Sequence, residues 1–271
     1  MRIPMENVVF GIPSYKRSDR CTTPDALEKM GVHASQIVIA TQNDDDYAAY
    51  RAVFGSRYHV VKRRGSCLSD NRNTLIDCTN GRPMMMLDDD IRGFMFLAED
   101  GNGKRKYWKA PGWVFRKFVE TGFSLVSGRP RDVFGFRPNG NPLCAHRRIT
   151  MGCLIEGTCQ AFISNPEQRY DHTYIVKEDF EHTCRLLSAG GRTYRFDDFC
   201  SICTHFATDG TGCGEHFSRD REMTTRLCRT FPNLVSPCVA KPNIRFIPKT
   251  RKFKSFLTDD EMTRAVSEVE K

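Results

Sequence analysis

The sequence lacks any long apolar run. No apolar segment approaches the roughly 18 residues that a transmembrane helix needs, and the opening stretch from Met1 to Asn7 lacks the apolar centre of a signal peptide. Internal repeats and low-complexity tracts are also absent. These absences predict a soluble, cytoplasmic protein, and 271 residues suffice for one large α/β domain with a good core.

The chain also lacks the features of a disulfide-stapled protein. Its 12 cysteines are scattered through a chain far larger than such proteins, with no export signal, so we expect most of them to be free, buried thiols. One group nevertheless has a spacing that suits zinc, namely Cys200, Cys203, Cys213 and His216. Because Cys200 and Cys203 fall in a stretch that also looks like a strand, zinc remains an open alternative to a purely structural role.

One long segment has no acidic residue. Between Lys241 and Leu257 there are six basic residues, with phenylalanines between them. A second basic cluster, from Lys104 to Lys117, contains the aromatic residues Tyr107, Trp108 and Trp113. With a net charge of +8, this pattern favours a nucleic-acid partner, because cations meet phosphates while rings stack on unpaired bases. The alternative for each cluster alone is an ordinary solvated basic surface.

Strands and helices alternate over the first ninety residues. Strands are predicted at 8–13, 37–40, 58–62 and 83–87, with helices at 25–30 and 69–78. This order indicates parallel βαβ units with helices on both faces of the sheet. Polar residues follow three of the strands, and parallel strands end at a common edge, so we expect these residues to converge there. Further along, we expect a loop at 97–111, short strands and turns at 127–150, helices at 113–125, 179–189 and 218–229, and strand structure at 192–206.

The segment from Met84 to Asp90 is the most informative one. An apolar strand ends there in three consecutive carboxylates, Asp88, Asp89 and Asp90. Adjacent carboxylates repel one another, and a hard divalent cation that also bridges to phosphates would neutralise them. The segment therefore predicts a metal site for a phosphate or nucleotide leaving group. The alternative is a solvated acidic turn after a strand.

Four short polar motifs, in this order and spacing, resemble those of GT-A glycosyltransferases. They are Ile12–Arg17, Asp70–Asn73, Leu87–Asp90 and Lys177–Asp179. The resemblance spans roughly residues 8–206. It implies a GT-A-like, Rossmann-like α/β fold, with a mostly parallel sheet flanked by helices and a mixed acceptor-side part. We expect one catalytic domain over residues 1–240, with a donor half at 1–96 and an acceptor half at 97–240, followed by a basic extension at 241–271.

The resemblance also implies the roles of the donor-site residues. Mn2+ or Mg2+ would be held by Asp88 and Asp90 with His205 as a third ligand, while Asp89 would be less directly involved. The donor, expected to be a UDP-sugar, would be bound by Pro13, Ser14, Tyr15, Arg17, Asn43, Asp44, Arg72, Asp88 and Asp89. Of these, Arg72 would face the diphosphate or the sugar. Plainer roles remain open: a structural imidazole for His205, a surface position for Arg17, and helix caps for Asp70 and Asn73.

Glu178 and Asp179 have the position of the catalytic carboxylate in inverting members of the resembled family. An acceptor hydroxyl is a weak nucleophile, and a carboxylate within hydrogen-bond reach can take its proton during attack. We expect Asp179 to be this base, with Glu178 as the second candidate. Alternatively, both acids only complement the dipole of the helix that they open.

A finer resemblance concerns the acceptor. The segments Tyr170–Asp171, Asp209–Gly214 and Lys241–Lys254 resemble those of phage DNA glycosyltransferases of the TET/JBP-associated type. This implies transfer to 5-hydroxymethylcytosine or 5-hydroxymethyluracil in DNA, and the host cytoplasm as the location if the protein is phage-encoded. An enzyme that acts on a base in a duplex usually extrudes the target nucleotide, and Tyr107, Trp108 or Trp113 of the basic cluster are candidates for filling the gap or stacking on the extruded base. Two alternatives stay open: a glycosyltransferase acting on a polysaccharide, lipid or protein, and a metal-dependent nuclease or other DNA-binding protein.

Overall fold

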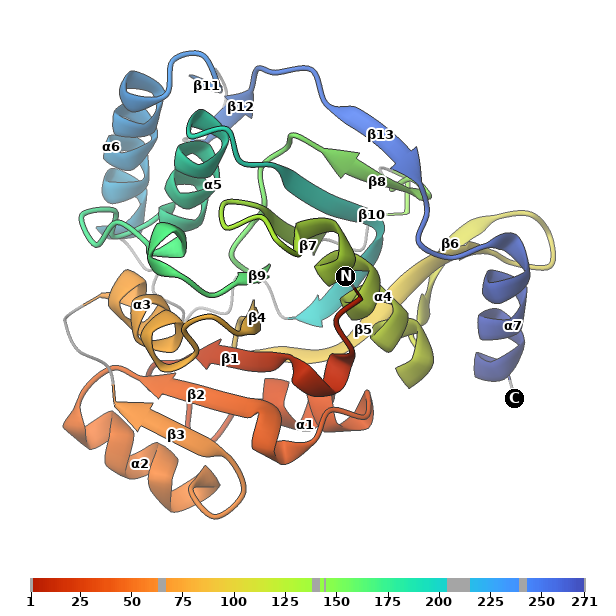
Figure 1. Cartoon of the computed structure of the whole chain (residues 1–271), viewed down its shortest axis with the longest axis horizontal. Coiled ribbons are helices and arrows are strands. Elements are labelled where there is room, and N and C mark those ends of the chain that lie inside the picture. The colour runs from red at the N-terminus through yellow and green to blue at the C-terminus, as the bar shows by residue number, and fades with distance from the viewer. Residues whose placement is uncertain are drawn as a thin grey trace.

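The computed structural model of the chain describes residues 2–62, 67–137, 142–143, 145–203, 215–238 and 243–270, and of residues 215–218 only the backbone. The described elements form one mixed 11-stranded sheet flanked by helices, together with a separate two-stranded sheet (Figure 1). The path of the large sheet is β13-β8-β10-β7-β9-β4-β1-β2-β3, and the pair β5 and β6 attaches to β10. No helix within these described ranges is long and apolar enough to cross a membrane.

The first half of the chain builds the parallel part of the sheet. Its strands are β1 (Val9–Pro13), β2 (Ile37–Thr41), β3 (His59–Lys62) and β4 (Pro83–Leu87), linked through α1 (Thr23–Lys29), α2 (Asp44–Phe54) and α3 (Leu68–Cys78). Every residue of β1 and β2 is buried, as expected for parallel strands covered on both faces. The four predicted strands and the alternating βα order are therefore confirmed.

Two local predictions in this half need correction. The sequence analysis missed α2, whose first turn consists of Asp44, Asp45 and Asp46 and whose N-cap is Asn43. Acidic residues stabilise the first turn of a helix through its dipole, so the polar run after β2 is a helix start. The helix predicted at 69–78 begins at Leu68, and its N-cap is Cys67.

The expected loop at 97–111 is wrong. Residues 91–109 form a hairpin of β5 (Ile91–Glu99) and β6 (Arg105–Lys109), and only the tip at 100–104 is a turn. The Asp100 carboxylate accepts the backbone N–H groups of Asn102 and Lys104 at 2.9 Å, which closes that turn. Trp108 is buried in the core. The charged residues around it in β6 made the segment look like a loop, although one face of the strand is apolar. Burial also removes Trp108 from the candidates for stacking on a base.

The second half adds strands of both directions. It contains α4 (Gly112–Val126), β7 (Val133–Arg137), β8 (Arg148–Met151), β9 (Cys159–Ile163), α5 (Glu178–Ser188), β10 (Thr193–Cys203), α6 (Glu215–Thr230), β11 (Val235–Pro237), β12 (Ile244–Phe246), β13 (Arg251–Lys254) and α7 (Asp259–Val269). β9 pairs with β4 antiparallel and joins the halves of the sheet. The predicted helices at 113–125, 179–189 and 218–229 are confirmed within a few residues, as is the strand that became β10.

A cluster of phenylalanines forms the main core between α4 and the sheet. Phe118 of α4 stacks on Phe199 of β10 with ring centroids 4.5 Å apart. Gly122, one turn further along α4, lies so close to the sheet that a Cβ there would stand 2.1 Å from the ring of Phe134. Phe256 lies 5.5 Å from Phe196 in the same cluster, so residues beyond 240 contribute to this core. The ten described cysteines are all free, and half of them are buried.

β10 changes partners at a pair of buried carboxylates. Its first half pairs with β7 and β8, its second half pairs with β5, and the register with β7 shifts between Phe196 and Cys200. Asp197, fully buried, accepts hydrogen bonds from the side chains of Arg148, Thr150 and Arg195. Burial acts to raise the pKa of Asp197, but the Arg195 cation and these hydrogen bonds outweigh it and leave that pKa lowered.

For the next residue, Asp198, burial outweighs the stabilising contacts and the pKa is raised. Its carboxylate accepts a hydrogen bond from the hydroxyl of Ser255, while its other oxygen has no partner among the described residues. Burial raises the pKa of Asp198 to about 7, and the Ser255 hydrogen bond and the nearby Arg147 only partly oppose this. Asp198 thus ties the segment after β13 to the bend of β10 without a cation bound directly to it.

The different environments of these carboxylates predict opposite effects of pH on two variants. The folded protein holds the Asp198 proton more tightly than the unfolded chain does, where the pKa is about 3.9. The contribution of Asp198 to stability is therefore lost as the pH rises from about 4 through about 7. We expect Asp198→Asn, which cannot ionise, to gain stability relative to wild type over this range, by up to about 4 kcal/mol.

Thermal unfolding of wild type and variants between pH 4 and pH 8 measures this difference. Asp197→Asn is the matched control. Because the pKa of Asp197 is lowered on folding, its stabilisation is present above the unfolded pKa and this variant should lose most stability at neutral pH. The same pH dependence in both variants would contradict the assignment.

Candidate active site

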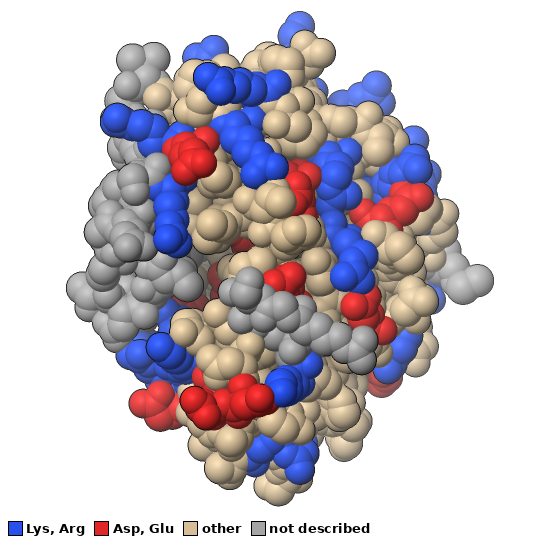
Figure 2. Space-filling view, turned by 90° about the vertical axis from the view of Figure 1, so that its left-hand side faces the viewer, with Lys and Arg blue, Asp and Glu red and all other residues tan. Residues whose placement is uncertain are grey.

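Polar residues from three strand ends meet at one edge of the sheet. β1, β2 and β4 are parallel neighbours, and their carboxyl ends lead into residues 14–17, 42–46 and 88–90. In Figure 1 the ends of β1 and β2 point to the left, and Figure 2 views the molecule from that side. In that view acidic atoms lie in a hollow near the centre of the face, with basic side chains around it. The convergence expected from the sequence is confirmed.

Asp89 is bound to the loop that follows β1. Its carboxylate accepts hydrogen bonds from the hydroxyl of Ser14 and, at 2.7 Å, from Nη1 of Arg17. The hydroxyl of the buried Tyr50 lies 2.5 Å from Ser14 Oγ and accepts the backbone N–H of Arg17 at 3.1 Å. Asp89 is 8% exposed. It therefore orders the loop at 14–17 and does not face the hollow.

Asp88 and Asp90 are the more open members of the acidic triplet, with 39% and 29% of their side chains exposed. Partial burial raises the pKa of Asp88, the Arg72 cation opposes this, and the negative charges of Asp90 and Asp179 add to the rise. An excess of carboxylate charge thus collects here, and it fits a hard divalent cation. Within the described ranges no three metal-ligating side chains converge, so a metal site at Asp88 and Asp90 stays an untested prediction.

The third predicted ligand, His205, lies outside the described residues. The described part of β10 ends at Cys203, which is paired with Ile91, the residue that follows Asp90. In the alternative zinc set, Cys200 is buried and Cys203 half-buried in β10. Cys213 lies outside the described residues, and the side chain of His216 is not described. The zinc set therefore stays an untested prediction.

Arg72 connects the donor-side acids to the acceptor-side helix. Its side chain is only 2% exposed; Nη2 lies 3.6 Å from Asp88 Oδ1, and Nε lies 3.3 Å from Glu178 Oε1. The guanidinium also donates to the carbonyl of Gly157 at 3.4 Å and lies 5.3 Å from the ring of Tyr170. The predicted diphosphate-binding arginine is thus buried among protein groups, between two carboxylates that come from different halves of the chain.

Glu178 and Asp179 are the first residues of α5, after Lys177 in a left-handed conformation with φ of 60°. Burial raises the pKa of Glu178 to about 7, the neighbouring Asp179 adds to this rise, and Arg72 opposes it. Asp179 is half-buried. Its Oδ2 accepts the backbone N–H of Gly157 at 2.7 Å, and its Oδ1 accepts the N–H of Phe180 at 2.8 Å. Only Asp179 of this pair combines partial exposure with a fixed position.

The motif at 70–73 fastens three segments to α3. Asp70 caps the helix by accepting the N–H of Cys67 at 3.0 Å, which matches the plainer of its predicted roles. Asn71 donates to the carbonyl of Ser14 at 3.2 Å. Asn73 is no cap, because its side chain both donates to the carbonyl and accepts the N–H of Tyr170, at 2.9 and 2.7 Å. Through these hydrogen bonds α3 fixes the positions of the loop at 14–17 and of Tyr170 in the segment that leads to α5.

Sequence reasoning missed several residues that shape this edge. Asn43 and Asp44 are exposed; Asn43 caps α2, and Asp44 forms an ion pair with Lys62. The buried acid here is Asp46, which accepts the backbone N–H groups of Lys16 and Gln42 at 2.9 and 3.2 Å. Its spacing of three residues from a capping Asn is the signal that marks it. Gly157 and Tyr50 gave no comparable signal.

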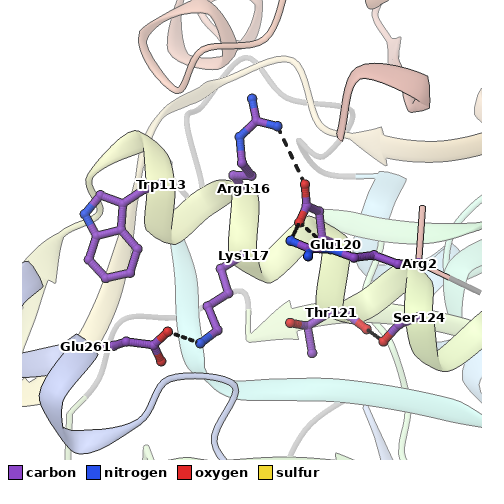
Figure 3. Close-up of a pocket in the computed structure, with 8 residues that line it drawn as sticks. All are labelled: Arg2, Trp113, Arg116, Lys117, Glu120, Thr121, Ser124 and Glu261. Atoms are coloured by element: carbon purple, nitrogen blue, oxygen red, sulfur yellow. Dashed lines mark hydrogen bonds and ion pairs between the residues drawn. The ribbon is translucent and has the colours of Figure 1, made fainter. Parts of the chain in front are cut away.

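A separate cavity of about 570 Å³ is lined by residues of α4, α7 and the N-terminal segment (Figure 3). Its charged groups form ion pairs with one another. Arg2 and Arg116 approach Glu120 to 2.5 and 3.6 Å, and Lys117 pairs with Glu261. None of the predicted donor-site, metal or catalytic residues lines this cavity, although Trp113, a candidate for stacking on a base, does. The cavity is therefore not the candidate active site.

Comparison with known proteins connects this geometry to a family. A family model described as TET-Associated Glycosyltransferase matches residues 8–212. The mannosyltransferase PcManGT from Pyrobaculum calidifontis, solved with GDP-Man and Mn2+, is similar at a TM-score of 0.51 and 13% identity, over 84% of this chain and 63% of that one. Glucosyl-3-phosphoglycerate synthase from Mycobacterium tuberculosis, solved with Mn2+, UDP and glucosyl-3-phosphoglycerate, gives a TM-score of 0.46 and 12% identity, over 93% and 91%.

The likeness to the mannosyltransferase confirms the expected GT-A-like α/β fold. The chain spans 63% of the length of that enzyme. Comparison with curated proteins by sequence gives no match.

The buried position of Arg72 predicts a strong coupling with Glu178. Arg72→Met leaves the Glu178 carboxylate buried without its cation, which should cost about 3–5 kcal/mol of unfolding free energy. Arg72→Met combined with Glu178→Gln should recover much of this loss, because the glutamine carries no charge. Urea unfolding of the single and double variants measures the coupling.

Arg169→Met is the control, because Arg169 and Asp77 form an ion pair whose side chains are 46% and 54% exposed. Loss of such an exposed pair should cost less than about 1 kcal/mol. If the double variant is no more stable than Arg72→Met alone, the buried pair is not the main contact of Arg72.

Proposed function

Because the chain belongs to the TET-associated glycosyltransferase family, we propose that it transfers a sugar from a nucleotide-sugar donor to the hydroxymethyl group of 5-hydroxymethylcytosine, or 5-hydroxymethyluracil, in DNA. The observation that carries this proposal is the link through Arg72 between Asp88, after β4, and Glu178, the first residue of α5 and the neighbour of Asp179. A donor-binding group and a base for the acceptor are thereby held in one connected cluster.

The donor side would be formed by the acidic triplet and the loop after β1. Asp88 and Asp90 suit Mn2+ or Mg2+, which commonly binds through one or two carboxylates and completes its shell with water and phosphate oxygens. Such a cation stabilises the negative charge of the departing diphosphate. Two similar proteins, solved with Mn2+ and with GDP-Man or UDP, support this choice of donor class. Asp89 and Asp46 would fix the loop at 14–17 against the nucleotide.

Asp179 is the preferred base. Each oxygen of Asp179 accepts one backbone N–H and keeps a second lone pair, which can accept the proton of an acceptor hydroxyl. In the reaction the acceptor oxygen bonds to the anomeric carbon and its proton passes to Asp179. The bond from that carbon to the donor phosphate oxygen breaks, and the electron pair leaves with the nucleoside diphosphate. Glu178, buried against Arg72, would position the arginine.

A transfer assay tests the proposal. The protein is incubated with Mn2+, a panel of UDP- and GDP-sugars, and duplexes that contain cytosine, 5-hydroxymethylcytosine or 5-hydroxymethyluracil, and the nucleosides are weighed by mass spectrometry. We expect the mass of one sugar residue on a hydroxymethylated base. Donor hydrolysis without this gain would move the proposal to a polysaccharide, lipid or protein acceptor, and DNA cleavage without donor would indicate a nuclease.

Asp179→Asn should lower the transfer rate by on the order of 10²–10⁴, the usual contribution of a general base. Glu167→Gln serves as the control, since Glu167 is 42% exposed and pairs with Arg131 away from the site. Transfer by Asp179→Asn within tenfold of wild type would show that another group removes the proton.

Members of the acidic triplet should differ in their effect on metal binding. Asp88→Asn and Asp90→Asn each remove one of the open carboxylates, and we expect each to weaken Mn2+ binding at least tenfold, measured as free Mn2+ by electron paramagnetic resonance with UDP present. Asp89→Asn instead loosens the loop at 14–17, so it should weaken UDP binding while Mn2+ binding without nucleotide stays near wild type. Equal losses of Mn2+ in all three variants would refute this division of roles.

A further inference from the structure

One face of the sheet around β10 carries cations from four strands. In β13 and β8, Lys254 is paired with Arg148 and Lys252 with Thr150, and Thr150 is paired in turn with Arg195 of β10. Paired residues of neighbouring strands share a face. Alternation along β6 adds Arg105 and Lys109, because Trp108 between them points into the core. We call this set the basic face: Arg105, Lys109, Arg148, Arg195, Lys252 and Lys254.

The opposite face of the same strands is the core face. Ile149 and Phe196 are buried there in the cluster under α4. On the basic face, Arg105, Lys109, Lys252 and Lys254 are exposed, and the side chains of Arg148 and Arg195 are 26% and 24% exposed. The sheet thus presents its second surface as a layer of cations above the buried Asp197.

The two basic clusters of the sequence meet on this face. Nη1 of Arg105 donates to the carbonyl of Ala145 at 3.1 Å, and the hydroxyl of Tyr107 donates to the carbonyl of Asp197 at 3.4 Å. His146 is exposed between them, and its pKa is lowered first by the Arg148 cation and also by Arg105 and Lys252. Segments far apart in the chain therefore direct their cations to one area. Figure 1 shows β8 and β13 above β10, and β6 to its right.

The positive charge of this area is only partly balanced locally, because the six cations share the face with two acids, the buried Asp197 and Glu99, which is paired with Arg105. Asp197 is shared between Arg148 and Arg195, and Glu156 also acts on Arg195. Lys109 and Lys252 have no carboxylate in ion-pair contact among the residues that the structure describes. Elsewhere exposed arginines are commonly paired, as Arg57 is with Glu28 and Arg131 with Glu167. The face therefore retains charge for an external anion.

A single strand connects the basic face to the candidate active site. β10 carries Arg195 on the face, and it ends at Cys203 beside Ile91, the residue after Asp90. At about 3.3 Å per residue, the six steps from Asp197 to Cys203 span at most about 20 Å. A duplex has one phosphate per strand about every 3.4 Å, so this span corresponds to about six nucleotides.

We propose that the basic face binds the phosphate backbone of the acceptor duplex on one side of the base that enters the active site. The inference rests on the proposed function, because it assigns a surface to the DNA acceptor. Continuity with the site favours the backbone of the acceptor itself over an anionic membrane. The phosphates position the duplex without reading its sequence, and the base chemistry stays with the carboxylates at the end of the strand.

Removal of three lysines from the face tests the proposal. Lys109→Gln, Lys252→Gln and Lys254→Gln are combined in one variant, and Lys29→Gln, Arg221→Gln and Arg229→Gln in a control with the same change of net charge. The control residues are exposed and belong to α1 and α6. Binding to a fluorescent 30-base-pair duplex with one 5-hydroxymethylcytosine is measured by anisotropy between 50 and 300 mM salt, after thermal unfolding has shown that both variants are folded.

We expect the face variant to bind at least tenfold more weakly at the lowest salt, with the slope of log Kobs against log salt reduced by about 3, that is about 1 per lost phosphate contact. The control should behave as wild type. In transfer assays the face variant should show a raised KM for duplex and an unchanged kcat. Transfer to the free nucleoside of 5-hydroxymethylcytosine should be unaffected.

The possible failures are distinguishable. Equal weakening in the two variants overturns the proposed face, because only total charge would then matter. If wild type transfers sugar to DNA and the face variant binds the duplex as tightly as wild type, the proposed role of the basic face is wrong while the proposed function stands. If wild type transfers no sugar to DNA while the face variant still loses duplex binding, the face is supported and the acceptor is wrong. Preferential loss of binding to phosphatidylserine vesicles, with duplex binding intact, assigns the face to a membrane and overturns the proposal.

Discussion

The guanidinium of Arg72 is the group around which the active-site edge is organised. It is almost fully buried between Asp88 after β4 and Glu178 at the start of α5, and a buried carboxylate without a cation is strongly unfavourable. The donor half and the acceptor half therefore satisfy a common electrostatic requirement, and neither carboxylate can leave its position without exposing the charge of another group. Asp70, Asn71 and Asn73, on the same helix, add directional hydrogen bonds to the flanking segments.

The three aspartates after β4 have identical side chains but different surroundings, because each occupies a different position at the strand end. Successive residues point in different directions, so Asp89 turns toward Ser14 and Arg17 while Asp88 and Asp90 remain open. A triplet of this kind combines an internal anchor with two outward carboxylates. The first residues of α5 differ in the same way: Glu178 faces the buried arginine, and the half-buried Asp179 is held by backbone N–H groups.

The sequence alone predicts the parallel half of the fold well, since β1, β2 and β4 are apolar runs bounded by polar ends and the βα order fixes their common edge. It also predicts that Asp88, Arg72 and Asp179 belong to one site, through motif order. It does not predict β6, where charged residues hide a strand with one buried face, nor α2, whose acidic first turn resembles a loop. The contacts of Asn73 and Asp46 are equally hidden, because they are made to backbone groups of distant segments and leave no pattern in the local sequence.

Gly157 contributes no side chain, yet it lies between Arg72 of the donor half and Asp179 of the acceptor half. A Cβ at this position would stand 2.7 Å from Nη2 of Arg72 and 3.3 Å from Oδ2 of Asp179, whose carboxylate is held by the Gly157 N–H. Any other amino acid there would displace the arginine or the carboxylate. In a scan of all single substitutions, position 157 should be as intolerant as a reacting residue, although no atom of it takes part in the chemistry. Substitutions at this position therefore test the separation between the donor-side arginine and the acceptor-side carboxylate. A map of mutational effects would identify the active site through Gly157, a residue without a side chain.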